Sequence, residues 1–295
     1  MSKLSQLSLA AKFNVVFLAV FVVGFIATSV VSNFLLQKSA REETMAKAGL
    51  LMGAALASRT YTSKQILPLL ESRLKFEFVP QSIPSFGATE QLNQLLKAYP
   101  GYSYKEATLN PTNLRDLATP WEAAVVRQLR AAPTAEVTGQ HDGPGGPSLY
   151  MARPLQINDP ACLSCHSTPD AAPKTMLDVY GRAHGFGWQL HEVIGAQVVS
   201  VPLALATQRA DQLLRNYMLS MLGIFVFLFC ALNAMVHLFV TRRLRQMSTM
   251  ADQISLGATD VGEIDVRGSD ELATLAQSFG RMRTSLVSAM KMLEE

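Results

Sequence analysis

Cys162-Leu163-Ser164-Cys165-His166 is the stretch on which the interpretation of the whole chain depends. Two thiols lie three residues apart, and an imidazole follows the second one directly. Covalent attachment of a c-type haem requires this spacing, because each thiol adds to one haem vinyl group and the next residue is held under the iron as its proximal ligand. The motif therefore predicts one haem c per chain, bound through Cys162 and Cys165, with His166 on the iron.

Two other uses of a cysteine pair are a redox centre and half of a zinc site. The third cysteine, Cys230, lies in an apolar run, and no second pair is present to complete a set of four zinc ligands. With two of three cysteines assigned to haem, no disulfide framework is available, so we expect packing to stabilise the fold.

The composition indicates a membrane protein. The 295 residues are 49% hydrophobic and only 17% charged, which is more apolar than a soluble chain of this size. The net charge of +3 is too small to suggest nucleic-acid binding, and no basic run interleaves with aromatic residues. A lipid bilayer is the expected partner, and nucleic acid is not.

Two uncharged runs, residues 13–36 and 217–240, are long enough to cross a hydrocarbon layer of about 30 Å as helices. We interpret the first as an uncleaved anchor, because it exceeds the apolar core of a signal peptide and no clean cleavage site follows it.

Positive residues flank the outer ends of both spans: Lys3 and Lys12 precede the first, and Arg242, Arg243 and Arg245 follow the second. Positive ends belong in the cytoplasm. We therefore expect a bacterial inner-membrane protein with both termini cytoplasmic and a periplasmic domain, on the side where haem c is attached in bacteria. The predicted order is a cytoplasmic N-terminus (1–12), a span (13–36), an extracytoplasmic domain (37–216), a span (217–240) and a cytoplasmic helical module (241–293).

The external region has a mixed α+β pattern. A helix is expected to continue from residue 37 to about 72, with Met45, Ala48, Met52 and Leu56 on one face and a kink or end at Pro68. Short apolar runs predict strands at 76–79, 102–107, 148–157 and 196–202, and helices near 88–98 and 120–131. The glycine- and proline-rich turn at 142–147 predicts an antiparallel hairpin.

Beyond the second span, two apolar stripes recur at steps of three and four residues. The first contains Leu244, Met247, Ala251 and Ile254, and the second contains Leu272, Leu275, Phe279, Met282, Leu286, Ala289 and Leu293. A connector at 257–268, with Ile264 and Val266 able to anchor it, joins them. Ser269 can cap the second helix, and Asp270 and Glu271 suit its positive dipole end. One helix pair buries these stripes incompletely, so we expect a homodimer.

Two resemblances follow from these motifs. The arginine-rich exit, the paired stripes and Asp270-Glu271-Leu272 resemble a HAMP module, the parallel dimeric four-helix relay of bacterial transmembrane receptors, although an early proline and a glycine after the acidic pair are absent. The external region resembles the c-type haem sensor domains with a PAS-like antiparallel sheet that lie between the spans of such receptors. The matching motifs are 102–107, 110–113, 152–154, 162–166, 185–188 and 195–197.

A haem pocket needs apolar walls and a few polar groups for the propionates. The candidates are Tyr102, Tyr104, Phe186 and Trp188 for the walls, and Lys105 and Arg153 for the propionates.

The sixth iron ligand has several candidates. The resemblance to these sensor domains implies that in some of them the helix after the first span supplies a sulfur ligand to the iron. The corresponding helix here has no cysteine, but Met52 lies on its apolar face. An open or water-bound site, His184 and His191 are the alternatives. Tyr61 and His141 are weaker, because a lone histidine beside a Gly-Pro turn is usually exposed to solvent.

The interpretation these features favour is a haem-based sensor of redox state or of a diatomic gas that relays its signal through the HAMP module. The alternative is a membrane-anchored cytochrome for electron transfer, which has no use for a relay. A haem enzyme needs acid–base groups near His166, and none is evident, so an enzyme is not expected. No effector sequence follows before Glu295. We therefore expect a separate cytoplasmic signalling partner or a shortened chain.

Overall fold

The computed structural model describes residues 8–133, 136–143, 146–256 and 270–294. It divides into two compact units: Asn33–Leu213 forms one, and Met1–Ser32 with Leu214–Glu295 forms the other. Each unit is described by itself below.

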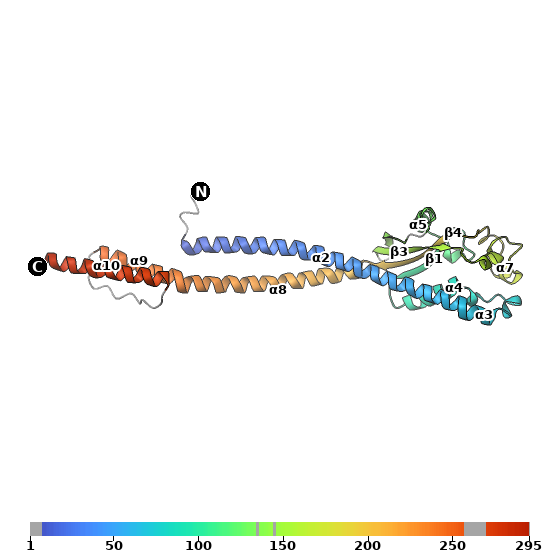
Figure 1. The fold of residues 1–295 in the computed structure, drawn as a ribbon, viewed down its shortest axis with the longest axis horizontal. Coiled ribbons are helices and arrows are strands. Elements are labelled where there is room, and N and C mark those ends of the chain that lie inside the picture. The colour runs from blue at the N-terminus through green and yellow to red at the C-terminus, as the bar shows by residue number, and fades with distance from the viewer. Residues whose placement is uncertain (1–7, 134–135, 144–145, 257–269, 295) are drawn as a thin grey trace. The chain divides into compact units, whose positions relative to one another are not determined.

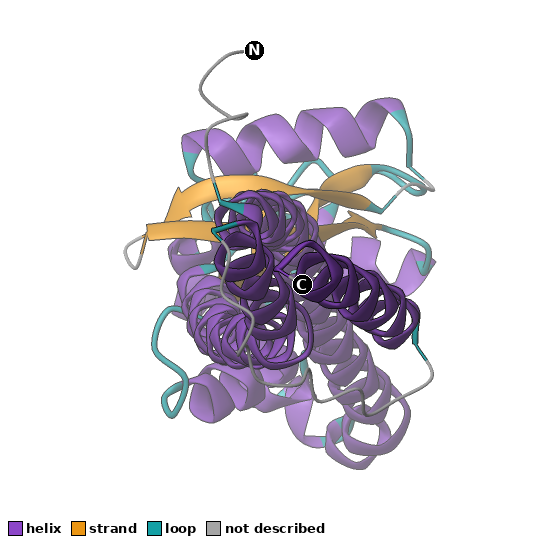
Figure 2. Ribbon diagram, turned by 90° about the vertical axis from the view of Figure 1, so that its left-hand side faces the viewer, coloured by secondary structure: helices purple, strands orange, loops and turns teal. Residues whose placement is uncertain are grey.

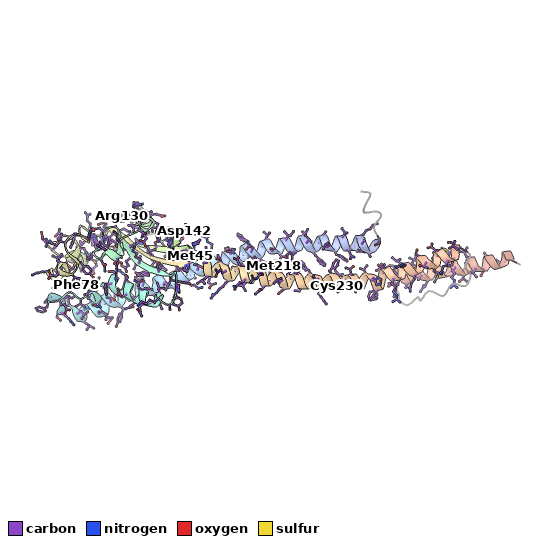
Figure 3. The ribbon with its side chains drawn as sticks, turned by 180° about the vertical axis from the view of Figure 1, so that it is seen from behind. Met45, Phe78, Arg130, Asp142, Met218 and Cys230 are labelled. Carbon is purple, nitrogen blue, oxygen red and sulfur yellow. The ribbon has the colours of Figure 1, made fainter. Side chains whose placement is uncertain are left out.

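Two long helices contain the apolar runs (Figure 1). Helix α2, Leu9–Tyr61, continues through a π-turn, η1 (Thr62–Ile66), into α3 (Leu67–Leu70), which contains Pro68. Helix α8, Ala204–Val236, continues through a second π-turn, η6 (His237–Thr241), into α9 (Arg242–Ser255). Both are long and apolar enough to cross a membrane, and their most apolar segments are not buried within the structure. The third cysteine, Cys230, is exposed on α8 (Figure 3).

The Asn33–Leu213 unit is built on a four-stranded antiparallel sheet in the order β1-β4-β3-β2. Its strands are β1 (Ser103–Thr108), β2 (Val137–Gly143), β3 (Gly146–Gln156) and β4 (Val193–Pro202). The predicted hairpin is confirmed as the β2–β3 pair, although the tip at 144–145 lies outside the described residues. The mixed helix and antiparallel-sheet class is therefore confirmed.

One predicted strand is wrong. Residues 76–79 follow a 3₁₀ turn, η2 (Arg73–Lys75), and precede another, η3 (Pro80–Ser82). The Phe76 N–H bonds to the Arg73 carbonyl, and the Glu77 side chain pairs with Arg73, so these residues satisfy their polar groups locally. Four mostly apolar residues are too few to outweigh such local bonds.

Helices cover both faces of the sheet (Figures 1 and 2). Helix α4 (Pro84–Leu96) and the inner side of α2 pack on one face, in a cluster that includes Met52, Leu92 and Tyr104. Helix α5 (Pro120–Ala131) covers the other, with Val126 and Leu129 buried. Thr119 and Glu122 form a capping box that begins α5. Four short elements complete the unit, namely η4 (Leu114–Asp116), η5 (Pro160–Cys162), α6 (Leu163–His166) and α7 (Lys174–Tyr180).

In the other unit, α9 is followed by α10 (Glu271–Glu294). The Asp270 carboxylate accepts a hydrogen bond from the Ala273 N–H, so Asp270 caps α10. The predicted cap Ser269 and the connector, with Ile264 and Val266, lie outside the described residues. Much of the predicted second stripe is uncovered, since Leu275, Met282 and Leu286 are 46–58% exposed.

Candidate functional site

The two thiols lie on one turn of helix. Asp159 accepts a hydrogen bond from the Ala161 N–H and so caps η5, which runs directly into α6. Cys162 and Cys165 are half-buried and free, and their i, i+3 spacing places them on one side of this turn. Burial, then the charge of Asp159, raises the pKa of the Cys162 thiol, so the thiol stays protonated.

The His166 ring is held in one orientation. Its Nδ1 lies 2.8 Å from the Gly185 carbonyl oxygen, and its face stacks on Trp188 with centroids 3.9 Å apart. A carbonyl only accepts, so Nδ1 carries the proton and Nε2 keeps a lone pair. Burial lowers the pKa of His166, which keeps the ring neutral. This is the state in which an imidazole binds iron.

Gly185 is required at its position. Its φ is +83°, and a Cβ there would lie 2.0 Å from Thr112 Oγ1 and 2.8 Å from Thr112 Cα. Asn110 holds the same segment from both sides, because it accepts from the Gly185 N–H and donates to the Phe186 carbonyl. The structure thus brings two of the motifs noted in the sequence, 110–113 and 185–188, together around His166.

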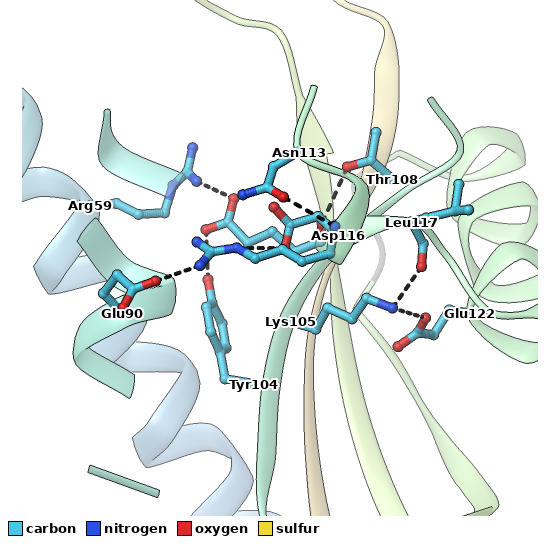
Figure 4. A network of polar contacts seen from close by, with 11 residues as sticks. Arg59, Glu90, Tyr104, Lys105, Thr108, Asn113, Asp116, Leu117 and Glu122 are labelled. Carbon is cyan, nitrogen blue, oxygen red and sulfur yellow. Dashed lines mark hydrogen bonds and ion pairs between the residues drawn. The ribbon is translucent and has the colours of Figure 1, made fainter. Parts of the chain in front are cut away.

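A buried ionic cluster lies on the α2-facing side of the sheet (Figure 4). Glu106 on β1 is 2% exposed and forms an ion pair with Arg59 of α2. The Tyr104 hydroxyl donates to Glu106 over 2.8 Å, and Gln197 donates to Tyr104. The positive charge of Arg59 also acts on Cys162, where it opposes the rise in thiol pKa. The charge of this cluster therefore acts on the turn that carries Cys162.

Arg59 and Glu106 were not predicted as site residues. Two signals were present: α2 has no charge from Ala48 to Ser58, so Arg59 ends an apolar run, and Glu106 alternates with Tyr104 on a strand. Neither pattern distinguishes a buried charge from a solvated one.

The predicted pocket residues separate into two groups. Trp188 contacts His166, and the half-buried Phe186 lies in the same segment. Lys105 points to the face opposite Tyr104, because neighbours on a strand alternate, and it donates to Glu122 and to the Leu117 carbonyl.

Arg153 is half-exposed and pairs with Glu136 over 2.8 Å. It pairs in register with Gln197 on β4, which in turn pairs with Glu106 on β1. The assignment of Lys105 and Arg153 to haem propionates stays a prediction.

The candidates for the sixth ligand lie in different surroundings. Met52 is 1% exposed in the apolar cluster with Tyr104, whereas His184 and His191 are exposed. Tyr61 is exposed as well. The expectation that His141 faces solvent is wrong, since its ring stacks on Trp121 with centroids 4.0 Å apart and its Nε2 lies 2.6 Å from Ser200 Oγ.

Comparison with protein families gives two matches. The model described as Tll0287-like (Tll0287) matches residues 37–202, more than half of the chain, and the HAMP domain model matches residues 235–288. The chain belongs to the Tll0287-like family. The solved structure titled "Crystal structure of the cyanobacterial heme-protein Tll0287" is similar with 14% identity and a TM-score of 0.41, over 54% of this chain and 95% of that one. The comparison with curated proteins found no match.

The order expected from the sequence, a haem-protein type of domain between two candidate spans and then a HAMP domain, is confirmed. Cys162, Cys165 and His166 all lie inside the Tll0287-like match. Two free thiols on one turn and an imidazole whose Nε2 is unprotonated are the groups that a covalently bound haem needs. The residues therefore fit the group.

Proposed function

We propose that this Tll0287-like protein is a membrane-bound sensor that holds one haem c in its 37–202 domain and relays a signal through its HAMP domain to a separate cytoplasmic protein. The observation that carries the proposal is the Gly185 carbonyl on His166 Nδ1, which fixes the ring in the tautomer of an iron ligand directly after a pair of free thiols.

Each residue of the site has a defined task in this proposal. Cys162 and Cys165 form the thioether links, His166 supplies Nε2, and Trp188 keeps the ring in place. When bound, the haem would supply a redox-active iron that can also bind a diatomic gas. Met52 is the proposed sixth ligand, with His184, His191 or water as alternatives. Tyr104, Phe186 and Arg153 are proposed to contact the porphyrin or its propionates, whereas Lys105 would have to leave Glu122 on the opposite face of the sheet to do so.

The exposed apolar stripe on α10 supports a dimer. An open groove of about 420 Å³ lies between α9 and α10 and includes Ile254, Phe279 and Met282 among its lining residues. A second copy of the helix pair would cover it, as a parallel four-helix relay requires. With Lys12 and Arg242 at the cytoplasmic ends of the spans, the haem domain is proposed to be periplasmic and both termini cytoplasmic in the bacterial inner membrane.

Electron transfer by a membrane-anchored cytochrome is the second candidate, and the HAMP domain favours the sensor over it. We further propose that the protein is not an enzyme. A reduced-minus-oxidised spectrum with and without carbon monoxide reports coordination and gas access together.

The test is covalent attachment of the haem. The protein is made in a host with c-type haem maturation and extracted with acid and acetone, which removes non-covalent haem. We expect haem to stay on the parent chain and on Cys230→Ala, the matched control, and to be lost from the Cys162→Ala, Cys165→Ala double variant. Complete extraction from the parent, or unchanged haem in the double variant, contradicts the proposal.

A further inference from the structure

We propose that the ion pair between Arg59 and Glu106 is the contact through which the haem-attachment segment acts on α2. The inference rests on the proposed function, because it concerns how the haem site is connected to a membrane helix. It makes Arg59 and Glu106 positioning residues that set the charge beside the haem and hold α2 to the sheet.

Arg59 lies where the apolar packing of α2 ends. The inner face of the helix contributes Ala48, Met52 and Ala55 to the core, and no charged residue occurs between Lys47 and Arg59. The next turn of the helix therefore contacts the sheet through an ion pair rather than through apolar side chains. An ion pair responds to a change of charge nearby, whereas apolar packing does not.

Glu106 gives this contact its strength. Its side chain is 3% exposed, and a buried carboxylate needs both a cation and hydrogen-bond donors. Arg59 supplies the cation and Tyr104 supplies a hydroxyl. The ion pair with the buried Glu106 thus holds the Arg59 guanidinium of α2 against β1.

The charge of the same guanidinium also acts on the turn that carries Cys162 and Cys165. The charge of Arg59 favours the ionised form of the Cys162 thiol, against burial and the charge of Asp159. One side chain of α2 therefore acts on both Glu106 and the first haem-linking residue. A change of charge at the haem alters the balance of forces on Arg59.

The loop from Thr112 to Asp116 connects His166 with the surroundings of Glu106. Thr112 Oγ1 lies 3.4 Å from His166 Nδ1, and four residues later the half-buried carboxyl of Asp116 is under the influence of Glu106. The loop also contains Arg115, which pairs with Glu90 of α4 and lies over the Phe86 ring, so it is held in place. The charge of Glu106 thus acts on Arg59 of α2 and on the loop that contacts His166.

The first measurement is the midpoint potential of the haem in the full-length protein. Reduction adds one electron, so a nearby positive charge favours the reduced form. Arg59→Gln is expected to lower the potential, Glu106→Gln to raise it, and Arg59→Lys to leave it close to that of the parent. The Arg59→Gln, Glu106→Gln double variant, with its charges balanced again, should return toward the parent. Lys47→Gln removes a positive charge that is paired with Glu43 on the exposed side of α2, and it is the matched control.

The second measurement separates the effect of these charges on the haem potential from their role in transmitting a change to the HAMP helices. In a Cys230→Ser background, Leu286→Cys on α10 allows inter-chain cross-linking by a bis-maleimide, compared between oxidised and reduced protein. We expect the cross-linking yield to differ between oxidised and reduced protein in the parent and in Lys47→Gln. In the Arg59→Gln, Glu106→Gln double variant we expect no such difference, although its midpoint potential is close to that of the parent.

Equal potentials in Arg59→Gln and the parent overturn the inference, as does a redox-dependent cross-link that survives in the double variant. A parent chain without covalent haem would instead overturn the proposed function itself. The two failures are therefore distinguishable.

Discussion

Gly185→Ala tests the arrangement around His166 most directly, with Gly187→Ala as its matched control. The two glycines have nearly the same backbone conformation, with φ of +83° and +81°. A Cβ at Gly187 meets nothing within 4 Å, whereas one at Gly185 meets Thr112 Oγ1 at 2.0 Å and Thr112 Cα at 2.8 Å. The pair therefore separates backbone strain from steric overlap.

The expected losses follow from these distances. An alanine in the left-handed region costs about 1–2 kcal/mol, which is the whole expected effect at Gly187. Overlap with Thr112 adds about 1–3 kcal/mol at Gly185, because one of the overlapping atoms is backbone and cannot rotate away. Moving the Gly185 carbonyl off His166 Nδ1 adds about 1 kcal/mol more. We expect Gly185→Ala to lose about 3–6 kcal/mol and Gly187→Ala about 1–2.

Urea unfolding measures both losses, followed by tryptophan fluorescence in a Trp121→Phe background so that the signal comes from Trp188 stacked on His166. Adding Thr112→Ala to Gly185→Ala removes the Oγ1 overlap but not the Cα overlap, so it should restore part of the loss. Equal losses in Gly185→Ala and Gly187→Ala, or no recovery with Thr112→Ala, would refute the steric argument.

Three further predictions concern separate parts of the chain. Burial raises the pKa of Asp116 to about 6, so between about pH 4 and pH 6 the carboxyl is ionised in the unfolded chain but still protonated in the folded one. The parent should therefore lose on the order of 1 kcal/mol of unfolding free energy as pH rises across that window. Unfolding curves measured at each pH should show this loss in the parent and not in Asp116→Asn. Met52→Leu nearly conserves side-chain volume and should lower the free energy of unfolding by less than about 1.5 kcal/mol. If the Met52 sulfur is the sixth ligand, the variant should lose the low-spin iron spectrum, and an unchanged spectrum eliminates Met52. Phe279→Asp places a charge in the groove between α9 and α10 and should reduce cross-linking through Leu286→Cys without loss of haem; haem loss with intact cross-linking would contradict the relay.

The order of domains could be predicted, and the Cys162-to-His166 stretch could be noticed, because each depends on local spacing. The Cys162-to-His166 stretch is contiguous, and the spans and apolar stripes follow helical periodicity. The strands of the hairpin were predictable for the same reason, since the turn residues lie between them. Residues 76–79 show the limit of this reasoning, because four mostly apolar residues also fit a loop whose polar groups bond locally.

The surroundings of the motif could not be predicted, because they depend on contacts between distant segments. Asn110 bonds to Gly185 across 75 residues, and Arg59 pairs with Glu106 across 47. A sequence shows that such residues are polar but not that they meet. The same holds for His141, whose neighbours Trp121 and Ser200 come from α5 and β4.

The join between β4 and α8 contains almost no free chain. Every residue of β4 is buried, and the strand is bonded to β1 on one side and to β3 on the other. Leu203 alone separates Pro202 from the first residue of α8, and its N–H is bonded to the Pro147 carbonyl of β3. One residue spans at most about 3.6 Å, so this tether has almost no slack. The fully buried strand β4 and the first turn of α8 must therefore shift together, and lengthening the tether with glycines would let one move without the other.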